Sequence, residues 1–227
     1  MSDRYPASRL IEFARALLSR VSLDPDKANT VAEILVEGDL LGHNTHGLAL
    51  LPGYLAELEQ GSMTKSGEPR VLADFPAAVT WDGLRLPGPW LTVRAIELGM
   101  ERAQKNGSCT IVIRRSHHLA CLAAYLQRAT DRGFMVLLTC SDPNVSSVAP
   151  FGGRTDVFTP NPLAAAWPTE GDPVIIDVSM SVTTNALTKR LHHEGKRFPA
   201  PWALTAEGAP TDDPGACLLY TSDAADE

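Results

Sequence analysis

From about residue 70 onward, short apolar runs rich in β-branched side chains alternate with segments of helical periodicity. The apolar runs cover residues 109–113, 134–139 and 174–177, and the helical patterns cover residues 90–106 and 119–130. Apolar runs of this length are typical of buried strands, and their alternation with helices favours an α/β fold. Residues 141–162 are rich in Gly, Pro, Asn and Ser, which predicts a long loop.

The first 70 residues follow a different pattern, that of a small helical unit. Helical spacing of apolar side chains covers residues 8–18, 25–41 and 48–58. Asp24 suits the N-cap of the second helix, and Pro25 suits its first position. We therefore expect a helical unit over residues 1–70 and an α/β domain over residues 71–216.

Composition excludes several classes of protein. Lys and Arg total 20 against 27 Asp and Glu, so the formal net charge is −7 and no nucleic-acid partner is expected. No apolar run reaches the roughly 18 residues of a membrane span, and the first residues carry no apolar signal core. The four cysteines form no C-x-x-C pair. These features predict a cytoplasmic globular protein with reduced thiols and no membrane partner.

Residues 217–227, which read CLLYTSDAADE, resemble a translated sequencing adapter. Such segments are left out of fold reasoning. We therefore expect a non-native tail over residues 217–227 and a C-terminally truncated chain that ends near Ala216.

Histidines and one aspartate are the candidates for proton chemistry. His46 lies between two predicted helices, His118 follows the apolar run that ends at Ile113, and Asp177 ends another run. Ligand sites in α/β sheets lie at the carboxyl ends of strands, so Asp177 and His118 are expected at one edge. An imidazole exchanges protons near neutral pH, and a neighbouring carboxylate orients it. The alternatives are a structural histidine near a helix cap and an aspartate that caps the next helix.

Standard nucleotide and metal motifs are missing from the sequence. It contains no G-x-G-x-x-G after a strand, no G-x-x-x-x-G-K-[ST] and no G-x-S-x-G, which excludes a standard Rossmann site, P-loop or nucleophile elbow. His43 and His46 are three residues apart but lack further ligands in a zinc pattern, so no metal is expected. Asn161 stands between two prolines in an extended loop, and Gly152-Gly153 marks a turn.

Several motifs together resemble the type-2 malate/L-lactate dehydrogenase family. In chain order they are Thr45-His46-Gly47, Ser116-His117-His118, Pro150-Phe-Gly-Gly153, Asn161-Pro162 and Asp177-Val-Ser-Met-Ser181. The resemblance implies a non-Rossmann α/β fold with an N-terminal helical unit and a mixed-sheet cofactor domain. It also implies NAD or NADP as cofactor, a small 2-oxo or 2-hydroxy acid as substrate, and a homodimer when the protein is full length.

The resemblance assigns roles to individual residues. It implies His46, His118 and Asp177 as catalytic residues, with His46 exchanging the proton on the substrate oxygen. Cofactor contacts are implied for Ser141, Gly152, Gly153, Asn161, Asp177, Val178 and Ser179. Substrate contacts are implied for Thr45, His46 and Arg114.

One position departs from the family pattern. Family members often carry an arginine for the substrate carboxylate four residues after the catalytic histidine, and Leu50 stands there. Leucine cannot form the charge-assisted pair, so either Arg114 or Arg115 replaces the arginine or the substrate differs. The departure leaves open a non-catalytic ligand-binding relative, and the expected truncation leaves open an inactive fragment.

Overall fold

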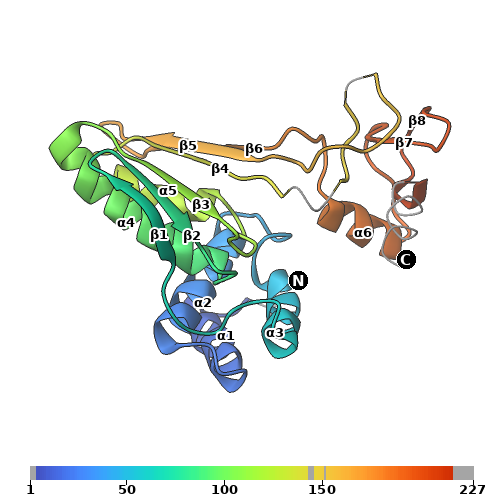
Figure 1. The fold of residues 1–227 in the computed structure, drawn as a ribbon. Helices are drawn as coiled ribbons and strands as arrows, with labels where there is room; N and C mark the ends of the chain where they lie inside the picture. Colours follow the sequence, from blue (N-terminus) through green and yellow to red (C-terminus); the bar gives the residue numbers. More distant parts are fainter. Residues whose placement is uncertain (1–3, 143–145, 151, 217–227) are drawn as a thin grey trace. The chain divides into compact units, whose positions relative to one another are not determined.

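The structure is a computed structural model that describes residues 4–142, 146–150 and 152–216 (Figure 1). The adapter-like residues 217–227 lie outside this described part. The chain divides into two compact units. Unit 1 comprises Met1–Leu137 and Ala165–Ile176, and unit 2 comprises Leu138–Ala164 and Asp177–Glu227. Each unit is described by itself.

Unit 1 begins with the helical elements that the sequence predicts. These are α1 (Ala7–Arg20), α2 (Pro25–Leu40), the 3-10 turn η1 (Leu48–Leu50) and α3 (Leu51–Gln60). Their apolar faces pack together, and Leu18, Ile34 and Leu58 are fully buried. Pro25 occupies the first helical position of α2, where its missing N–H costs no hydrogen bond. The third predicted helix differs only in opening with the 3-10 turn.

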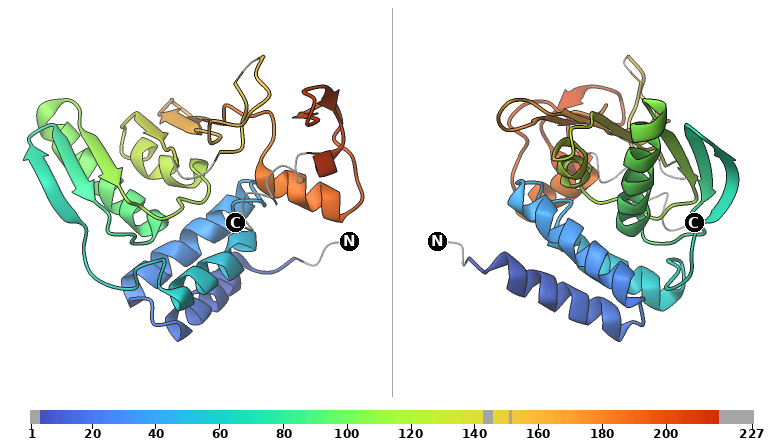
Figure 2. Two further views of the ribbon diagram at one scale, coloured as in Figure 1. Left: turned by 45° about the vertical axis from the view of Figure 1, so that its right-hand side comes forward. Right: turned by 90° about the vertical axis from the view of Figure 1, so that its left-hand side faces the viewer.

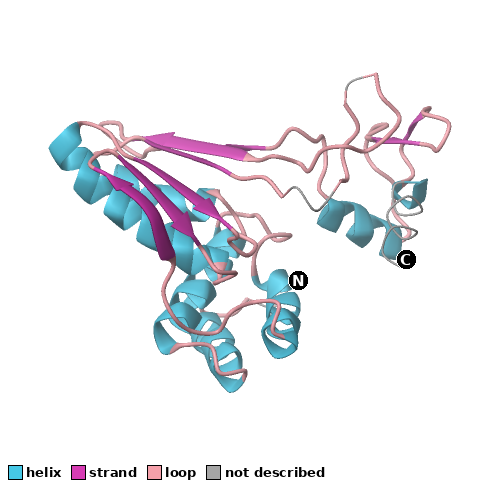
Figure 3. Ribbon diagram, in the orientation of Figure 1, coloured by secondary structure: helices cyan, strands magenta, loops and turns pink. Residues whose placement is uncertain are grey.

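A three-stranded mixed sheet follows in unit 1, with its strands in the order β1-β2-β3. Its elements are β1 (Arg70–Phe75), β2 (Ala78–Asp82), the crossover helix α4 (Gly88–Asn106) and β3 (Thr110–Arg114). β1 and β2 are antiparallel, whereas β2 and β3 are parallel, with Asp82 opposite Arg114. Figure 3 shows α4 lying along this sheet, and Ile113 of β3 packs against the cluster of Leu86, Trp90 and Leu91.

The expectation that 109–113 forms a strand buried on both faces is wrong. β3 alternates between exposed and half-buried residues, and Val112 is 54% exposed. The neighbouring strand β1 likewise leaves Phe75 62% exposed. The physical reason is that α4 packs against one face of the sheet, so side chains of the opposite face stay open.

A second sheet has the strand order β4-β5-β6. The elements of this part of the chain are α5 (Ala123–Thr130), β4 (Val136–Thr139), β5 (Leu163–Trp167) and β6 (Val174–Val178). The apolar runs predict β4 and β6. They do not predict β5, whose centre is three consecutive alanines, a residue type that is depleted in strands. The structure thus has the α/β fold with a mixed sheet that the sequence predicts.

The helical elements and the β1-β2-β3 part belong to one compact unit. Helix α2 contacts both α4 and α5, so the N-terminal helices and the first sheet share a core. The units therefore divide the chain elsewhere than at residue 70. The boundary between 1–70 and 71–216 stays a prediction.

Unit 2 is mostly loop, as its Gly- and Pro-rich sequence predicts. Residues 146–150 and 152–162 contain no regular helix or strand, apart from a single bridge between Val148 and Phe158. Its regular elements are α6 (Asn185–His193), β7 (Ala203–Leu204) and β8 (Pro210–Thr211), drawn in orange and red in Figure 2. The hydroxyl of Thr184 caps α6 by accepting a hydrogen bond from the Leu187 amide. Among the described helices, none combines the length and apolarity needed to span a bilayer.

Candidate functional site

Unit 1 brings two of the predicted catalytic side chains together. The rings of His46 and His118 are stacked, with 5.9 Å between their centroids and 23° between their planes. His46 comes from the loop between α2 and η1, and His118 comes from the loop between β3 and α5. His46 is half-buried and His118 is exposed, so the pair is within reach of a ligand.

The loop that carries His46 is closed tightly against the end of α2. The amide of His46 donates to the carbonyl of His43, and the amide of His43 donates to that of Gly38. Asp39 accepts a hydrogen bond from the Leu48 amide at 2.9 Å. A Cβ at Gly47 would overlap the Asp39 carboxylate, so a side chain there would displace that carboxylate from its hydrogen bond with Leu48. The Thr-His-Gly motif thus has a local physical cause.

Thr45 contacts its neighbour's imidazole. Its hydroxyl oxygen lies 2.9 Å from Nδ1 of His46. This contact orients the ring, so chemistry on a ligand would run through Nε2. The structure thus places Thr45, predicted as a substrate contact, against the histidine itself.

His118 is held by a tyrosine that the sequence analysis did not single out. The Tyr54 hydroxyl lies 2.9 Å from Nδ1 of His118 and 3.1 Å from the His118 carbonyl oxygen. Tyr54 is on α3 and only 4% exposed. Burial raises the pKa of Tyr54 well above its usual value, so the hydroxyl keeps its proton. The signal that could have found it is a tyrosine on an apolar helix face, because a buried hydroxyl needs a partner.

The segment that follows His118 departs from the predicted helix over 119–130. Helix α5 begins only at Ala123, and Ala120 has a φ of +59°, which no helix permits. The Ala120 amide donates a hydrogen bond to Nδ1 of His118 at 3.2 Å. His118 therefore precedes α5 in a turn of its own.

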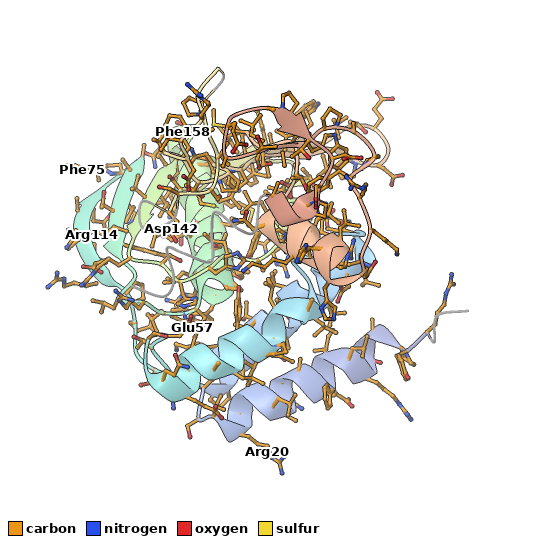
Figure 4. The ribbon with its side chains drawn as sticks, turned by 90° about the vertical axis from the view of Figure 1, so that its right-hand side faces the viewer. Arg20, Glu57, Phe75, Arg114, Asp142 and Phe158 are labelled. Atoms are coloured by element: carbon orange, nitrogen blue, oxygen red, sulfur yellow. The ribbon has the colours of Figure 1, made fainter. Side chains whose placement is uncertain are left out.

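The adjacent histidine, His117, faces α3. Its Nε2 lies 3.6 Å from an oxygen of Glu57, and its ring meets the Tyr54 ring edge-on at 6.0 Å. Figure 4 labels Glu57 on this helix. Helix α3 thus supplies partners to both His117 and His118.

A buried carboxylate anchors the strand end that leads into this loop. Asp82 is fully buried and accepts hydrogen bonds from Arg114, Arg115 and Arg70. The closest contact is 2.7 Å, to Nη2 of Arg115. Hydrogen bonds from Arg115, opposed by the cost of burial and aided by the Leu84 amide and Arg114, hold the pKa of Asp82 far below its usual range.

Arg114, predicted to bind the substrate carboxylate, is therefore already bonded. It donates to Asp82 through Nε at 3.2 Å and Nη2 at 3.0 Å. Its side chain is still 57% exposed. Figure 4 labels Arg114. Its role toward a substrate stays a prediction.

The remaining predicted residues lie in unit 2. Asp177 is half-buried in β6, Val178 is 54% exposed, and the Ser179 hydroxyl contacts the carbonyl of Ser181. Burial, together with Asp177 and Asp142, raises the pKa of the Cys140 thiol. Because Asp177 and His118 belong to different units, their expected meeting stays a prediction.

The predicted loop residues of unit 2 offer polar groups and open backbone. Ser141 is exposed, and Gly152 has a φ of +77°. Gly153 donates its amide to the Pro150 carbonyl, and Phe151 of this motif lies outside the described residues. Within the described part of the chain, the buried Oδ1 of Asn161 has no hydrogen-bond partner. Such an acceptor fits a ligand that brings an N–H or O–H group.

The comparisons with known proteins decide the family. The sequence matches the malate/L-lactate dehydrogenase family over residues 5–221. The chain belongs to this family.

Two dehydrogenases and one solved structure illustrate the relationship. The (2R)-3-sulfolactate dehydrogenase (NADP(+)) of Chromohalobacter salexigens is 31% identical, over 90% of this chain and 61% of that protein. The ureidoglycolate dehydrogenase (NAD(+)) of Escherichia coli strain K12 is 32% identical, over 88% of this chain and 57% of that protein. The crystal structure of malate dehydrogenase from Entamoeba histolytica has a TM-score of 0.92 at 24% identity, covering 98% of this chain and 62% of that one, and shows the fold.

This member of the malate/L-lactate dehydrogenase family spans about three fifths of the length of its relatives. Its helical region and mixed sheets agree with the fold that the resemblance implies. Its unit 1 holds the stacked histidines, and its unit 2 holds the segments expected to contact a nucleotide.

Proposed function

We propose that the protein carrying this chain transfers a hydride between NAD or NADP and a small 2-oxo or 2-hydroxy acid. The observation that carries the proposal is the stacked pair of His46 and His118 in a member of this family. The two named relatives support it, because each is a dehydrogenase named for a hydroxy acid.

The chemistry requires a proton as well as a hydride. In the reducing direction a 2-oxo acid, NAD(P)H and one proton give a 2-hydroxy acid and NAD(P)+. The bound nicotinamide supplies the hydride. His46 gives its Nε2 proton to the substrate oxygen and takes it back in the oxidising direction, which an imidazole does near neutral pH. His118 lies beside it and contacts the same oxygen.

The residues of unit 2 are our candidates for the nucleotide. We assign contacts to Ser141, Gly152, Gly153, Asn161, Asp177, Val178 and Ser179. The free acceptor on Asn161 supports this, since a nucleotide carries N–H and O–H donors. Asp177 is also proposed as the carboxylate partner of a catalytic histidine. One relative is named for NADP and the other for NAD, so either nucleotide fits the family.

We propose Arg114 for the substrate carboxylate. Three arginines share the single negative charge of Asp82, so the cluster keeps a net positive charge. Arg114 uses Nε and one terminal nitrogen on Asp82, and its second terminal nitrogen carries further donors. We also propose that the full-length protein is a cytoplasmic homodimer, as the family resemblance implies.

The test is an assay of the full-length protein with NADH and NADPH against a panel of 2-oxo acids. We expect cofactor oxidation with at least one acid and nicotinamide binding by calorimetry. The proposal would be overturned if the protein neither oxidised the cofactor with any acid nor bound the nicotinamide. Binding without turnover on any acid would favour a non-catalytic relative. The reason to consider that alternative is Leu50, which stands where the family often has an arginine.

A further inference from the structure

We infer that Tyr54 and the Ala120 amide hold neutral His118 with its proton on Nε2, so that His118 donates a hydrogen bond to the ligand oxygen while His46 exchanges the proton. The catalytic part of this inference rests on the proposed function. The position of the proton on the ring rests on the contacts around Nδ1 alone.

The first contact has a fixed direction. The Ala120 backbone N–H can only donate, and it points at Nδ1 of His118 at 3.2 Å. Nδ1 must therefore present a lone pair, because an N–H there would face a second N–H. In the neutral ring the proton then sits on Nε2.

The second contact is compatible with this assignment and holds the ring in place. The buried Tyr54 hydroxyl keeps its proton and lies near two acceptors, Nδ1 and the His118 carbonyl. If the hydroxyl donates to the carbonyl, Nδ1 still receives the Ala120 amide, and that bond requires a lone pair on Nδ1. Tyr54 contacts both the ring and the backbone of His118, which fixes the orientation of the imidazole.

The backbone adopts an unfavourable conformation to make the first contact. Ala120 has a φ of +59°, in the left-handed region that side chains other than glycine rarely adopt. Strained residues of this kind persist where the surrounding structure over-determines them, and they cluster at functional sites. Here the strained residue is the one whose amide points at the imidazole.

The partner of His46 is of a different kind. Its Nδ1 faces the hydroxyl of Thr45, which can donate or accept. His46 can therefore gain and lose a proton with its contact intact, whereas protonation of Nδ1 on His118 would break the bond from Ala120. The two stacked rings are thus suited to different tasks.

The test is 15N NMR of the chain labelled at histidine, above neutral pH, with His118 assigned by its loss in His118→Gln. We expect Nδ1 of His118 to show the shift of an unprotonated nitrogen and Nε2 that of a protonated one. A protonated Nδ1 in the wild type would overturn the inference. This readout needs no turnover, so its outcome is independent of the dehydrogenase assay.

Tyr54→Phe tests the role of the tyrosine as a positioning residue. We expect a changed 15N shift at Nδ1, because the imidazole loses the hydroxyl that faces this nitrogen, and a kcat about tenfold lower in the full-length protein with cofactor affinity unchanged. Tyr125→Phe is the matched control, because that tyrosine is also buried and its hydroxyl donates to the Leu119 carbonyl. An unaltered His118 spectrum in Tyr54→Phe, or the same change in Tyr125→Phe, would remove Tyr54 from this role.

Discussion

His46 and His118 have the same side chain but face different partners. Thr45 offers His46 a hydroxyl that adapts to either charge state, and Ala120 offers His118 an amide that can only donate. The sequence motifs predicted both histidines, because their residue type and loop positions are readable. They could not predict Tyr54, because its contact joins residues 64 positions apart.

Arg114 provides a prediction at the same scale. Arg114→Gln should raise the KM for the 2-oxo acid by about tenfold or more, because a charged hydrogen bond to the substrate is lost. Steady-state kinetics with saturating cofactor measures this. Arg70→Gln is the matched control, since Arg70 contacts the same Asp82 from β1. Equal KM values for the two variants would argue against a substrate contact by Arg114.

At the scale of elements, periodicity predicted α1, α2 and α4 because each has an apolar face and clear ends. It missed β5, whose alanines carry no strand signal, and it began α5 too early because the positive φ of Ala120 is invisible in the sequence. The sequence analysis also predicted that strands such as β3 are buried, because it considered only their apolar residues. Which face a helix covers depends on packing, which periodicity does not report.

Helix α1 allows a matched comparison of buried and exposed positions. Leu18 is 0% exposed and Phe13 is 60% exposed on the same helix. Leu18→Ala should lower the free energy of unfolding by about 2–5 kcal/mol, because a buried side chain leaves a cavity. Phe13→Ala should change it by about 0.5 kcal/mol or less. Urea unfolding measures both, and equal losses would mean that α1 does not pack as described.

The link between β2 and β3 predicts a dependence of stability on pH. The pKa of Asp82 is lowered in the folded state, so its bonds to the arginines stabilise the fold above the unfolded pKa of about 4. This contribution is lost as pH falls below about 4. Urea unfolding between neutral and acid pH should show a steeper loss for wild type than for Asp82→Asn. Parallel pH profiles would contradict the role given to Asp82.

At the scale of the whole molecule, the sequence match shows the family, and the chemistry that we propose rests on the pair of His46 and His118. The match covers residues 5–221, whereas the chain spans about three fifths of the relatives' length. Motif order was enough to predict the family and to single out the two histidines that lie together. The pairing of Asp177 with a histidine depends on two units at once, so motif order could only propose it.

The central claim is that His46 exchanges a proton with the substrate oxygen. The most direct measurement compares His46→Ala with His43→Ala, a histidine of the same loop, in the full-length protein. We predict that His46→Ala lowers kcat by about 10²–10⁴-fold while nicotinamide affinity is retained, and that His43→Ala stays close to wild type. Turnover of His46→Ala near the wild-type rate would contradict the account.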